Sequence, residues 1–386
     1  MSMPAAAYFD HNGTTALDAR VLEIMLPYLH AQQGNATSRH SYGRTARTAI
    51  DHAREQVADA VGAHPSQVIF TASGTEADNL AVRGIAGNMH GSARQIAYSA
   101  VEHPAVSRPA LAMRQYGFTA TAIAVDANGK LDKANLEGLL QTPTALVSAM
   151  LANNETGVIQ EIAEVAEAAK RHGAYMHTDG VQALGKIKLD FVDLNVHAMS
   201  LSAHKINGPQ GAGALILDKR VDLQPLLYGG GQERGLRSGS ENVAAIVGFG
   251  AACELASREL LQRTGTVRQL RDRLELGLKD LGAVIFGDAV ERLPNTSFFA
   301  FPEIEGETLV MALDRKGFAV ASGSACSSDS TEPSHVLLAM GVKPDLARGA
   351  VRVSLGSSNS SQQVESFLSV LENELLRLRR LTAIAV

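Results

Sequence analysis

A lysine stands where an apolar stretch of the sequence ends, at a position where it could act as a nucleophile. Residues 200–215 read SLSAHKINGPQGAGAL, so Ser202, His204 and Lys205 come between an apolar strand and a turn rich in Gly and Pro. Lysine is rarely buried without a partner. Among small residues at a strand end, its amine can lose its proton by desolvation and become a nucleophile. The alternative is an ordinary exposed lysine after a strand.

Two other apolar segments also end in polar residues. HTDGVQ (177–182) places Asp179 at a strand end, and TASGTEADN (71–79) follows a strand and opens a helix. Backbone N–H groups at that helix start, with Gly74 and the Thr75 hydroxyl, would hold a phosphate. Each segment also has a purely structural interpretation, because Asp often caps a turn and Thr-x-x-Asp is a common start of a helix.

The three strand ends together offer an anion cradle, a carboxylate and a lysine. Pyridoxal phosphate requires all three, because its phosphate needs N–H donors, its ring nitrogen an acidic partner and its aldehyde a lysine. No G-x-G-x-x-G motif follows the first strands, which disfavours a dinucleotide site. The sequence therefore predicts a pyridoxal phosphate site.

A cysteine in a segment of small residues is a further candidate. The chain has two cysteines, and Cys326 lies in ASGSACSSDST (321–331), which has nothing large to bury it. Such a segment is typical of an exposed loop, where a thiol is reactive, so a functional cysteine is the better interpretation. Cys253, in GFGAACELA, is typical of a buried helical cysteine kept for packing.

Seven strand-like segments separated by helical patterns must position these groups. Several are apolar almost throughout, as strands covered on both faces are. The alternation predicts an α/β fold with a mainly parallel seven-stranded sheet, whose ligands bind beyond the carboxyl ends of the strands. The segments are 68–72, 95–100, 121–125, 145–151, 174–179, 198–203 and 213–218.

A long helical stretch over 241–281 leads to a second pattern of shorter strands. A chain of 386 residues rarely folds around one core, so we expect two domains. The large cofactor domain is predicted over 15–255, and a smaller α+β domain over 1–14 plus 256–386, with the cysteine loop at 321–333. In the smaller domain the predicted strands are 283–287, 295–301, 318–322 and 351–356, and the predicted helices 306–317 and 361–378.

The composition argues against several classes of protein. The net charge is −5 and no basic run exceeds two residues, so a nucleic-acid-binding surface is not visible. Two cysteines make neither a disulfide framework nor a metal-ligand spacing, and we expect no metal site. No signal peptide and no apolar run long enough to span a bilayer is readable, so a cytoplasmic protein is expected.

In its motifs the sequence resembles the cysteine desulfurases of the NifS/IscS type. These are class-V aminotransferase-like enzymes of the aspartate-aminotransferase-like fold, fold type I of the pyridoxal phosphate enzymes. The resemblance runs almost from one end of the sequence to the other. The matching motifs identify the family only when they occur together. They are GNATSRHSYG, ASGTEADN, VEHPAV, NNETG, HTDGVQALGK, SAHKINGPQGAG, GGGQERGLRSGSEN and SGSACSS.

The resemblance implies a role at the cofactor for each matching residue. Lys205 binds the aldehyde as an imine, Asp179 pairs with the pyridine nitrogen, and Gln182 hydrogen-bonds the ring hydroxyl. His103 stacks on the ring and shuttles protons, although from the residues alone a helix start before Pro104 is the better interpretation. The residues implied to hold the phosphate are Gly74, Thr75, Ser202 and His204.

The resemblance also implies the substrate and partner contacts. Asn154 and Arg352 bind the substrate carboxylate, and Asn12 belongs to the same substrate site. Arginine suits a carboxylate because its planar fork grips both oxygens, but a strand arginine can equally be salt-bridged or solvated. Ser240 reaches the phosphate of the neighbouring subunit, which implies a homodimer.

The implied reaction takes sulfur from L-cysteine and leaves L-alanine and a persulfide on Cys326. Lys205 takes the Cα proton, the Cys326 thiolate attacks the substrate sulfur, and His103 is the candidate acid–base. The sulfur then passes to an acceptor protein, for iron–sulfur cluster assembly or other sulfur transfer.

Some features depart from the family and some alternatives stay open. Ser240 stands where the family usually has Thr, Gly180 replaces a common Ala, and the sequence ends without the C-terminal extension of the IscS branch. A selenocysteine lyase or an aminotransferase on the same fold would share the cofactor. A thiol hydrolase built on Cys326 and His335 would need no cofactor. A non-catalytic sulfur carrier would show no turnover even with the cofactor bound.

Overall fold

A seven-stranded sheet forms the centre of the larger part of the chain. The computed structural model describes residues 7–89, 91–323 and 332–384. Strand β8 (Gly213–Leu217) is antiparallel to both of its neighbours, and the other six strands point the same way. The spatial order is β2 (Val68–Thr71), β8, β7 (Ala198–Ser202), β6 (Tyr175–Asp179), β5 (Thr144–Ser148), β3 (Gln95–Ser99) and β4 (Thr119–Ile123).

This sheet confirms the predicted α/β fold and most of the predicted strands. The boundaries differ most at β4, which covers Thr119–Ile123 and so begins two residues before the predicted segment 121–125. Since the strands alternate with helices along the chain, their carboxyl ends reach one edge of the sheet. The candidate lysine and carboxylate both lie at that edge, at the ends of β7 and β6.

Helices cover both faces of the sheet, which explains the nearly continuous apolar strands. Neighbouring strand residues enter opposite clusters: Ile69 belongs to the cluster of Leu80 and Val106, and Phe70 belongs to that of Val57 and Phe249. The covering helices are α1 (Ala19–His30), α2 (Ser41–Ala60), α3 (Gly74–Gly87), α4 (Pro104–Ala112), α5 (Lys133–Leu139), α6 (Ile162–Arg171) and α7 (Val243–Arg258). Short 3-10 turns are η1 (Pro65–Gln67), η2 (Met113–Tyr116), η3 (Ala203–Lys205) and η4 (Glu233–Gly235).

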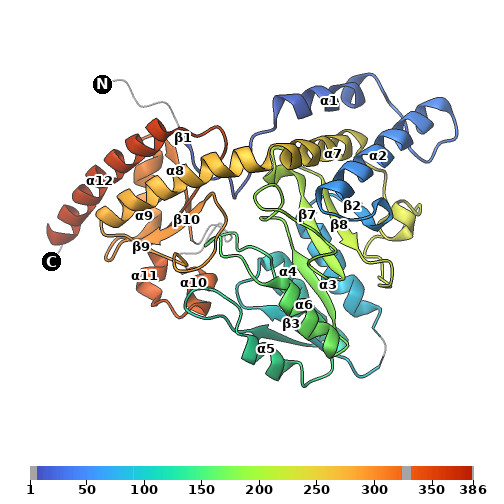
Figure 1. Ribbon diagram of the computed structural model, residues 1–386, viewed down its shortest axis with the longest axis horizontal. Helices are drawn as coiled ribbons and strands as arrows, with labels where there is room; N and C mark the ends of the chain where they lie inside the picture. Colours follow the sequence, from blue (N-terminus) through green and yellow to red (C-terminus); the bar gives the residue numbers. More distant parts are fainter. Residues whose placement is uncertain (1–6, 90, 324–331, 385–386) are drawn as a thin grey trace.

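A second, smaller sheet follows the long helix α8 (Leu260–Asp280), and Figure 1 shows α8 leading from α7 toward it. Its antiparallel order is β12 (Ala321–Ser322), β13 (Ala350–Ser354), β10 (Thr296–Ala300) and β9 (Val284–Ile285). The N-terminal strand β1 (Ala7–Tyr8) pairs with β11 (Phe318–Ala319). The helices of this part are α9 (Gly306–Asp314), α10 (His335–Ala339), α11 (Pro344–Arg348) and α12 (Ser361–Ile384).

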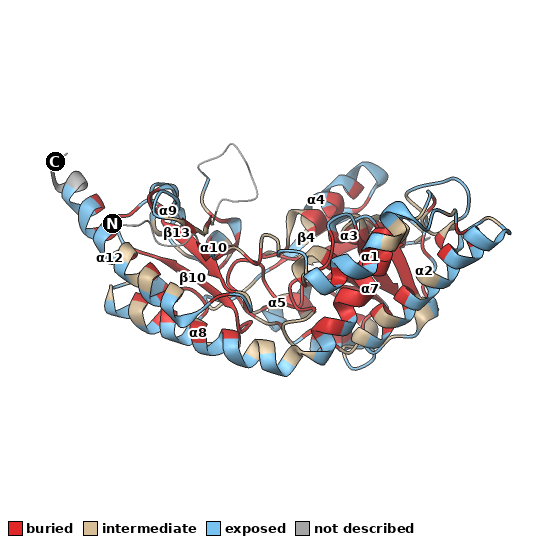
Figure 2. Cartoon of the chain, turned by 90° about the horizontal axis from the view of Figure 1, so that it is seen from above, coloured by how far each residue is buried: buried red, intermediate tan, exposed pale blue. Residues whose placement is uncertain are grey.

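Buried apolar side chains gather in both parts of the chain, and one cluster joins the parts because it combines Val101 and Met150 with Phe286 and Phe298. Figure 2 shows buried residues gathered around β10 and β13 on one side and around α3 and α7 on the other. Phe9, Phe318 and Phe367 pack together in the smaller part, so the N-terminal segment joins its core. The division into two domains, with boundaries at 14/15 and 255/256, remains a prediction.

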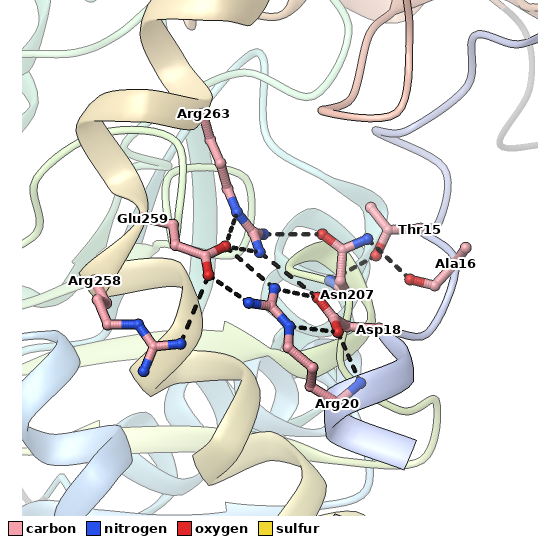
Figure 3. Close-up of polar contacts among 8 residues, drawn as sticks. All are labelled: Thr15, Ala16, Asp18, Arg20, Asn207, Arg258, Glu259 and Arg263. Atoms are coloured by element: carbon pink, nitrogen blue, oxygen red, sulfur yellow. Dashed lines mark hydrogen bonds and ion pairs between the residues drawn. The ribbon is translucent and has the colours of Figure 1, made fainter. Parts of the chain in front are cut away.

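The helical stretch predicted over 241–281 is two helices, which meet at Glu259 in a cluster of charges (Figure 3). Arg20 donates to Glu259 Oε1 over 2.6 Å and to Asp18 Oδ2 over 2.7 Å. Arg263 donates to Glu259 Oε2 over 2.5 Å and reaches Asn207 Oδ1 at 3.3 Å. The cluster thus ties the start of α1 and the segment just after Lys205 to the α7–α8 junction.

Among the described residues, no helix is both long and apolar enough to cross a membrane. In the same part of the chain, no group of three or more His, Cys, Asp and Glu side chains is placed to hold a metal ion.

Candidate active site

Seven segments of chain meet in one cavity of about 360 Å³ at the carboxyl edge of the large sheet, a size typical of a small-molecule site. The N-terminal segment, the β2–α3 turn, the residues after β3, β5, β6 and β7, and strand β13 of the smaller sheet contribute to it. The sequence-predicted residues that line it are Asn12, Gly74, Thr75, His103, Asn154, Asp179, Gln182, Ser202, His204, Lys205 and Arg352.

Lys205 reaches the cavity from η3, the turn that directly follows β7. Its Nζ donates to Asn12 O over 2.5 Å and to Gly13 O over 2.6 Å. The turn is held to the N-terminal segment as well, because Thr15 Oγ1 donates to His204 O over 2.8 Å and accepts from Asn207 N over 2.8 Å. The amine is therefore fixed by backbone carbonyls from a distant part of the sequence.

The start of α3 forms a cradle of backbone N–H groups. The Ser73 side chain caps the helix by accepting from Glu76 N, which leaves the first N–H groups directed at the cavity. A Cβ on Gly74 would lie 2.8 Å from Val181 Cγ2 and 3.3 Å from Ser202 Cβ, so only glycine fits this close approach. Ser202 Oγ, across the gap, is buried and has no hydrogen-bond partner in the described part of the chain. An anion bound here would accept hydrogen bonds from the N–H groups of α3 and from the Ser202 hydroxyl.

Asp179 ends β6 and is almost completely buried. Its Oδ1 accepts from Val181 N over 2.9 Å. Burial raises the pKa of Asp179 to about 6, while the Val181 N–H and the charge of Lys205 act in the opposite direction. A protonated ring nitrogen beside Asp179 would supply the positive charge that favours its ionised form.

Two more buried carboxyls lie near Asp179. Burial, and then the charge of Asp179, raise the pKa values of Asp78 and Glu102 well above their usual range. Asp78 also lines the cavity. Of these three buried carboxyls, Asp179 is therefore the one best suited to carry a negative charge.

His103 is both a helix cap and a lining residue of the cavity. Its Nδ1 accepts from Ala105 N over 3.0 Å at the start of α4, so the neutral ring carries its proton on Nε2. Burial lowers the pKa of His103 to about 4, and the charges of Lys205, His335 and Arg108 add to this effect. A bound phosphate dianion would raise it again. The two sequence interpretations of His103 are thus compatible.

Arg352 projects from β13 into the cavity and is already salt-bridged. Its Nη2 donates to Asp10 Oδ1 over 2.6 Å and its Nη1 to Asn154 O over 2.9 Å. Its Nε is buried without a hydrogen-bond partner in the described residues. The guanidinium is therefore oriented by contacts that use two of its five N–H donors, and donors remain for a ligand such as a carboxylate.

Two predicted residues are not among those that line the cavity. Cys326 falls outside the described residues, and Ser240 is exposed and not part of the cavity wall. The loop before Ser240 is anchored at two points near the β2–α3 turn. Arg54 pairs with Glu233 over 2.7 Å, and Arg237 pairs with Glu76 over 2.7 Å.

Sequence reasoning missed several residues of the cavity wall. Asp10 is the most informative of them, because its position within YFDHNG, two residues from Asn12, was a signal that could have been used. Of the others, Gly13, Ser73, Asp78 and Val181 lie within or beside the motifs already singled out, and Met150 had no signal in the sequence.

Three comparisons place the chain among known proteins. The aminotransferase class-V family model matches residues 7–367. A protein of Methanosarcina thermophila named cysteine desulfurase IscS is 42% identical over 378 residues, which are 98% of this chain and 94% of that protein.

Solved structures agree with the family model. A NifS-like protein superimposes with a TM-score of 0.91 at 39% identity, over 96% of this chain and 99% of that one. A structure described as SspA in complex with cysteine has a TM-score of 0.81 at 31% identity, over 92% of this chain and 99% of that one.

Proposed function

The chain belongs to the class-V aminotransferase family, and we propose that it is a cysteine desulfurase that uses pyridoxal phosphate. One observation carries this proposal: the N–H cradle of α3, the Asp179 carboxylate and the Lys205 amine line the same cavity as Arg352. The first three suit the phosphate, the ring nitrogen and the aldehyde of the cofactor, and Arg352 suits an amino-acid carboxylate.

The residues present fit the cofactor. The unpartnered Ser202 hydroxyl and the tight approach at Gly74 favour a phosphate at the start of α3, with Thr75 and His204 beside it. Gln182 and His103 line the same cavity, and we assign the ring contacts to them. When bound, pyridoxal phosphate supplies an electron sink for the substrate Cα.

The protein groups then divide the chemistry. Arg352 and Asn154 bind the substrate carboxylate, with Asn12 beside them, which orients the Cα–H bond toward Lys205. The Lys205 amine accepts the Cα proton and later returns one to the product. The neutral His103 donates its Nε2–H to the reacting groups.

Sulfur transfer is assigned to Cys326. Its thiolate attacks the sulfur of bound L-cysteine, so that an S–S bond forms as the substrate C–S bond breaks. The electron pair of that bond stays with the carbon, which takes a proton and leaves as L-alanine. The enzyme keeps the sulfur as a persulfide, and no outside oxidant is needed.

The partners of the enzyme follow from the same proposal. We expect a homodimer in which Ser240 contributes to the neighbouring phosphate site, and a protein that accepts the persulfide sulfur, such as an iron–sulfur scaffold. We place the enzyme in the cytoplasm.

The two cysteines of the chain provide the decisive experiment. Cys326→Ser should abolish release of sulfide and alanine from L-cysteine and leave the visible absorbance of the bound cofactor intact. The control is Cys253→Ala, because Cys253 is fully buried in α7 and burial raises the pKa of its thiol far above neutrality. Normal turnover in Cys326→Ser would refute the proposal.

The same assay separates the alternatives. An aminotransferase would keep its activity in Cys326→Ser, and a thiol hydrolase would lose activity but be colourless when purified. A sulfur carrier would bind the cofactor without turnover, and a selenocysteine lyase would prefer selenocysteine when rates on both substrates are compared.

A further inference from the structure

A second lysine, Lys186, contacts two side chains of the cavity wall. Its Nζ donates to Gln182 Oε1 over 2.7 Å and to Asn12 Oδ1 over 3.1 Å. Gln182 Nε2 in turn donates to Asn12 O over 3.1 Å. Three residues thus form a closed ring of hydrogen bonds, and Asn12 O also accepts from the Lys205 amine.

The turn after β6 explains why Lys186 lies there. Leu184 N donates to Gly180 O and Ile187 N to Ala183 O, so the chain makes a helical turn. Gln182 and Lys186 are four residues apart and face the same side of that turn. Gly185 between them has a φ of +68°, and a Cβ on it would lie 2.8 Å from Ile206 Cγ2. Glycine therefore lets the turn pack against the residue that follows Lys205.

The ring of hydrogen bonds fixes the orientation of the Gln182 amide. A backbone carbonyl only accepts, so Gln182 must direct its Nε2 toward Asn12 O. Its Oε1 then points to Lys186, whose amine donates whether it is charged or neutral. Without Lys186, the Gln182 oxygen would lose this donor, and only the hydrogen bond to Asn12 O would hold the amide.

No carboxylate compensates Lys186 in the described part of the chain. Burial, and then the charges of Lys205 and Arg352, lower the pKa of Lys186 well below its usual range. The other titratable groups that face it are His11 and His204, whose pKa values Lys186 helps to lower. Retaining a lysine in these surroundings is costly, which favours a specific use for its donors.

We propose that Lys186 is a positioning residue that holds Gln182 as an N–H donor toward the cofactor. This inference rests on the proposed function only in requiring that the site binds pyridoxal phosphate. Gln182 then donates to the ring hydroxyl oxygen, and Lys186 acts through it without touching the ring.

The test uses cofactor binding and its spectrum, which are independent of sulfur transfer. Lys186→Met removes the donor and keeps a similar shape. Apo-protein with this change should bind pyridoxal phosphate about tenfold more weakly. In the loaded protein, the pH midpoint of the visible absorbance should rise by about one unit, because a basic neighbour and a donor to the ring oxygen are both lost.

Two further variants make the test specific. Lys186→Gln keeps an N–H donor and should recover most of the cofactor affinity. Lys188→Met changes an exposed lysine two residues away and should behave as the parent protein. A Lys186→Met protein with unchanged affinity and an unchanged midpoint would overturn the inference. If the parent protein itself bound no cofactor, the proposed function would fail instead.

Discussion

At the scale of single residues, the surroundings of Lys205 distinguish it from the other lysines. Its amine is held by two backbone carbonyls from residues 12 and 13, in a cavity that also contains Asp179 and His103. These contacts hold the amine in place and leave the open cavity before it. Such a lysine is suited to form a covalent bond with an aldehyde.

Borohydride reduction of the loaded protein should therefore attach the cofactor to Lys205. Peptide mapping should find the pyridoxyl group on the peptide that contains Lys205, and Lys205→Ala should prevent it. Lys186 is the informative comparison, because it lies in the same network. A label on Lys186, or no label at all, would contradict the proposed site.

Asp10 is expected to compete with the substrate carboxylate for Arg352. The ion pair at 2.6 Å occupies one guanidinium nitrogen, while Asn154 O continues to orient another. Asp10→Asn should therefore lower KM for L-cysteine by about fivefold, or about 1 kcal/mol, with kcat unchanged. Arg352→Lys, which loses the planar fork, should raise KM instead. An increased KM in Asp10→Asn would mean that Asp10 orients Arg352 rather than competing.

At the scale of elements, the start of α3 depends on the absence of a side chain at residue 74. Gly74→Ala places a methyl group 2.8 Å from Val181 Cγ2, and overpacking of this kind typically costs about 1–3 kcal/mol. We expect weaker binding of pyridoxal phosphate to the apo-protein, measured by absorbance titration.

The control for Gly74→Ala is Gly138→Ala in α5. A Cβ at Gly138 meets nothing within 4 Å, so this change should leave cofactor affinity unaltered. It should also slightly stabilise the helix, since alanine is the better helix former. Equal cofactor affinity in the two variants would argue against a tightly packed cradle.

At the scale of the whole molecule, the charge cluster at the α7–α8 junction should make stability depend on acid. Hydrogen bonds from Arg20 lower the pKa of both Asp18 and Glu259 to about 2, from ordinary values of 3.8 and 4.5. The unfolded chain then binds more protons than the folded chain in this window. The stability that the two carboxylates contribute is present above pH 4.5 and is lost as pH falls toward 2.

Arg20→Met should flatten this dependence. Urea unfolding at a series of pH values from neutrality down to pH 2 would show it as a smaller loss of unfolding free energy with acid. Arg268→Met changes an exposed arginine of α8 and should keep the slope of the parent protein. If Arg20→Met kept that slope as well, the junction cluster would not control acid stability.

Much of this molecule could be predicted from the sequence because the relevant physics is local. Apolar runs such as 68–72 and 213–218 indicate strands that are buried on both faces. The residues next to the lysine, the aspartate and the glycine-containing helix start in the sequence indicate what each of them can do chemically. That was enough to predict the parallel sheet and to propose Lys205, Asp179 and Gly74 as one site.

Only the tertiary structure decided which distant groups meet. Asp10 pairs with Arg352 from 342 positions away, and Asn12 joins Lys186, Gln182 and Lys205 into one network. Such contacts have no periodicity to read, because they depend on how the smaller sheet and the N-terminal segment pack against the edge of the large sheet. The sequence by itself determined the helices, the strands and the candidate reactive residues. Tertiary packing decided which distant side chain contacts each of those residues.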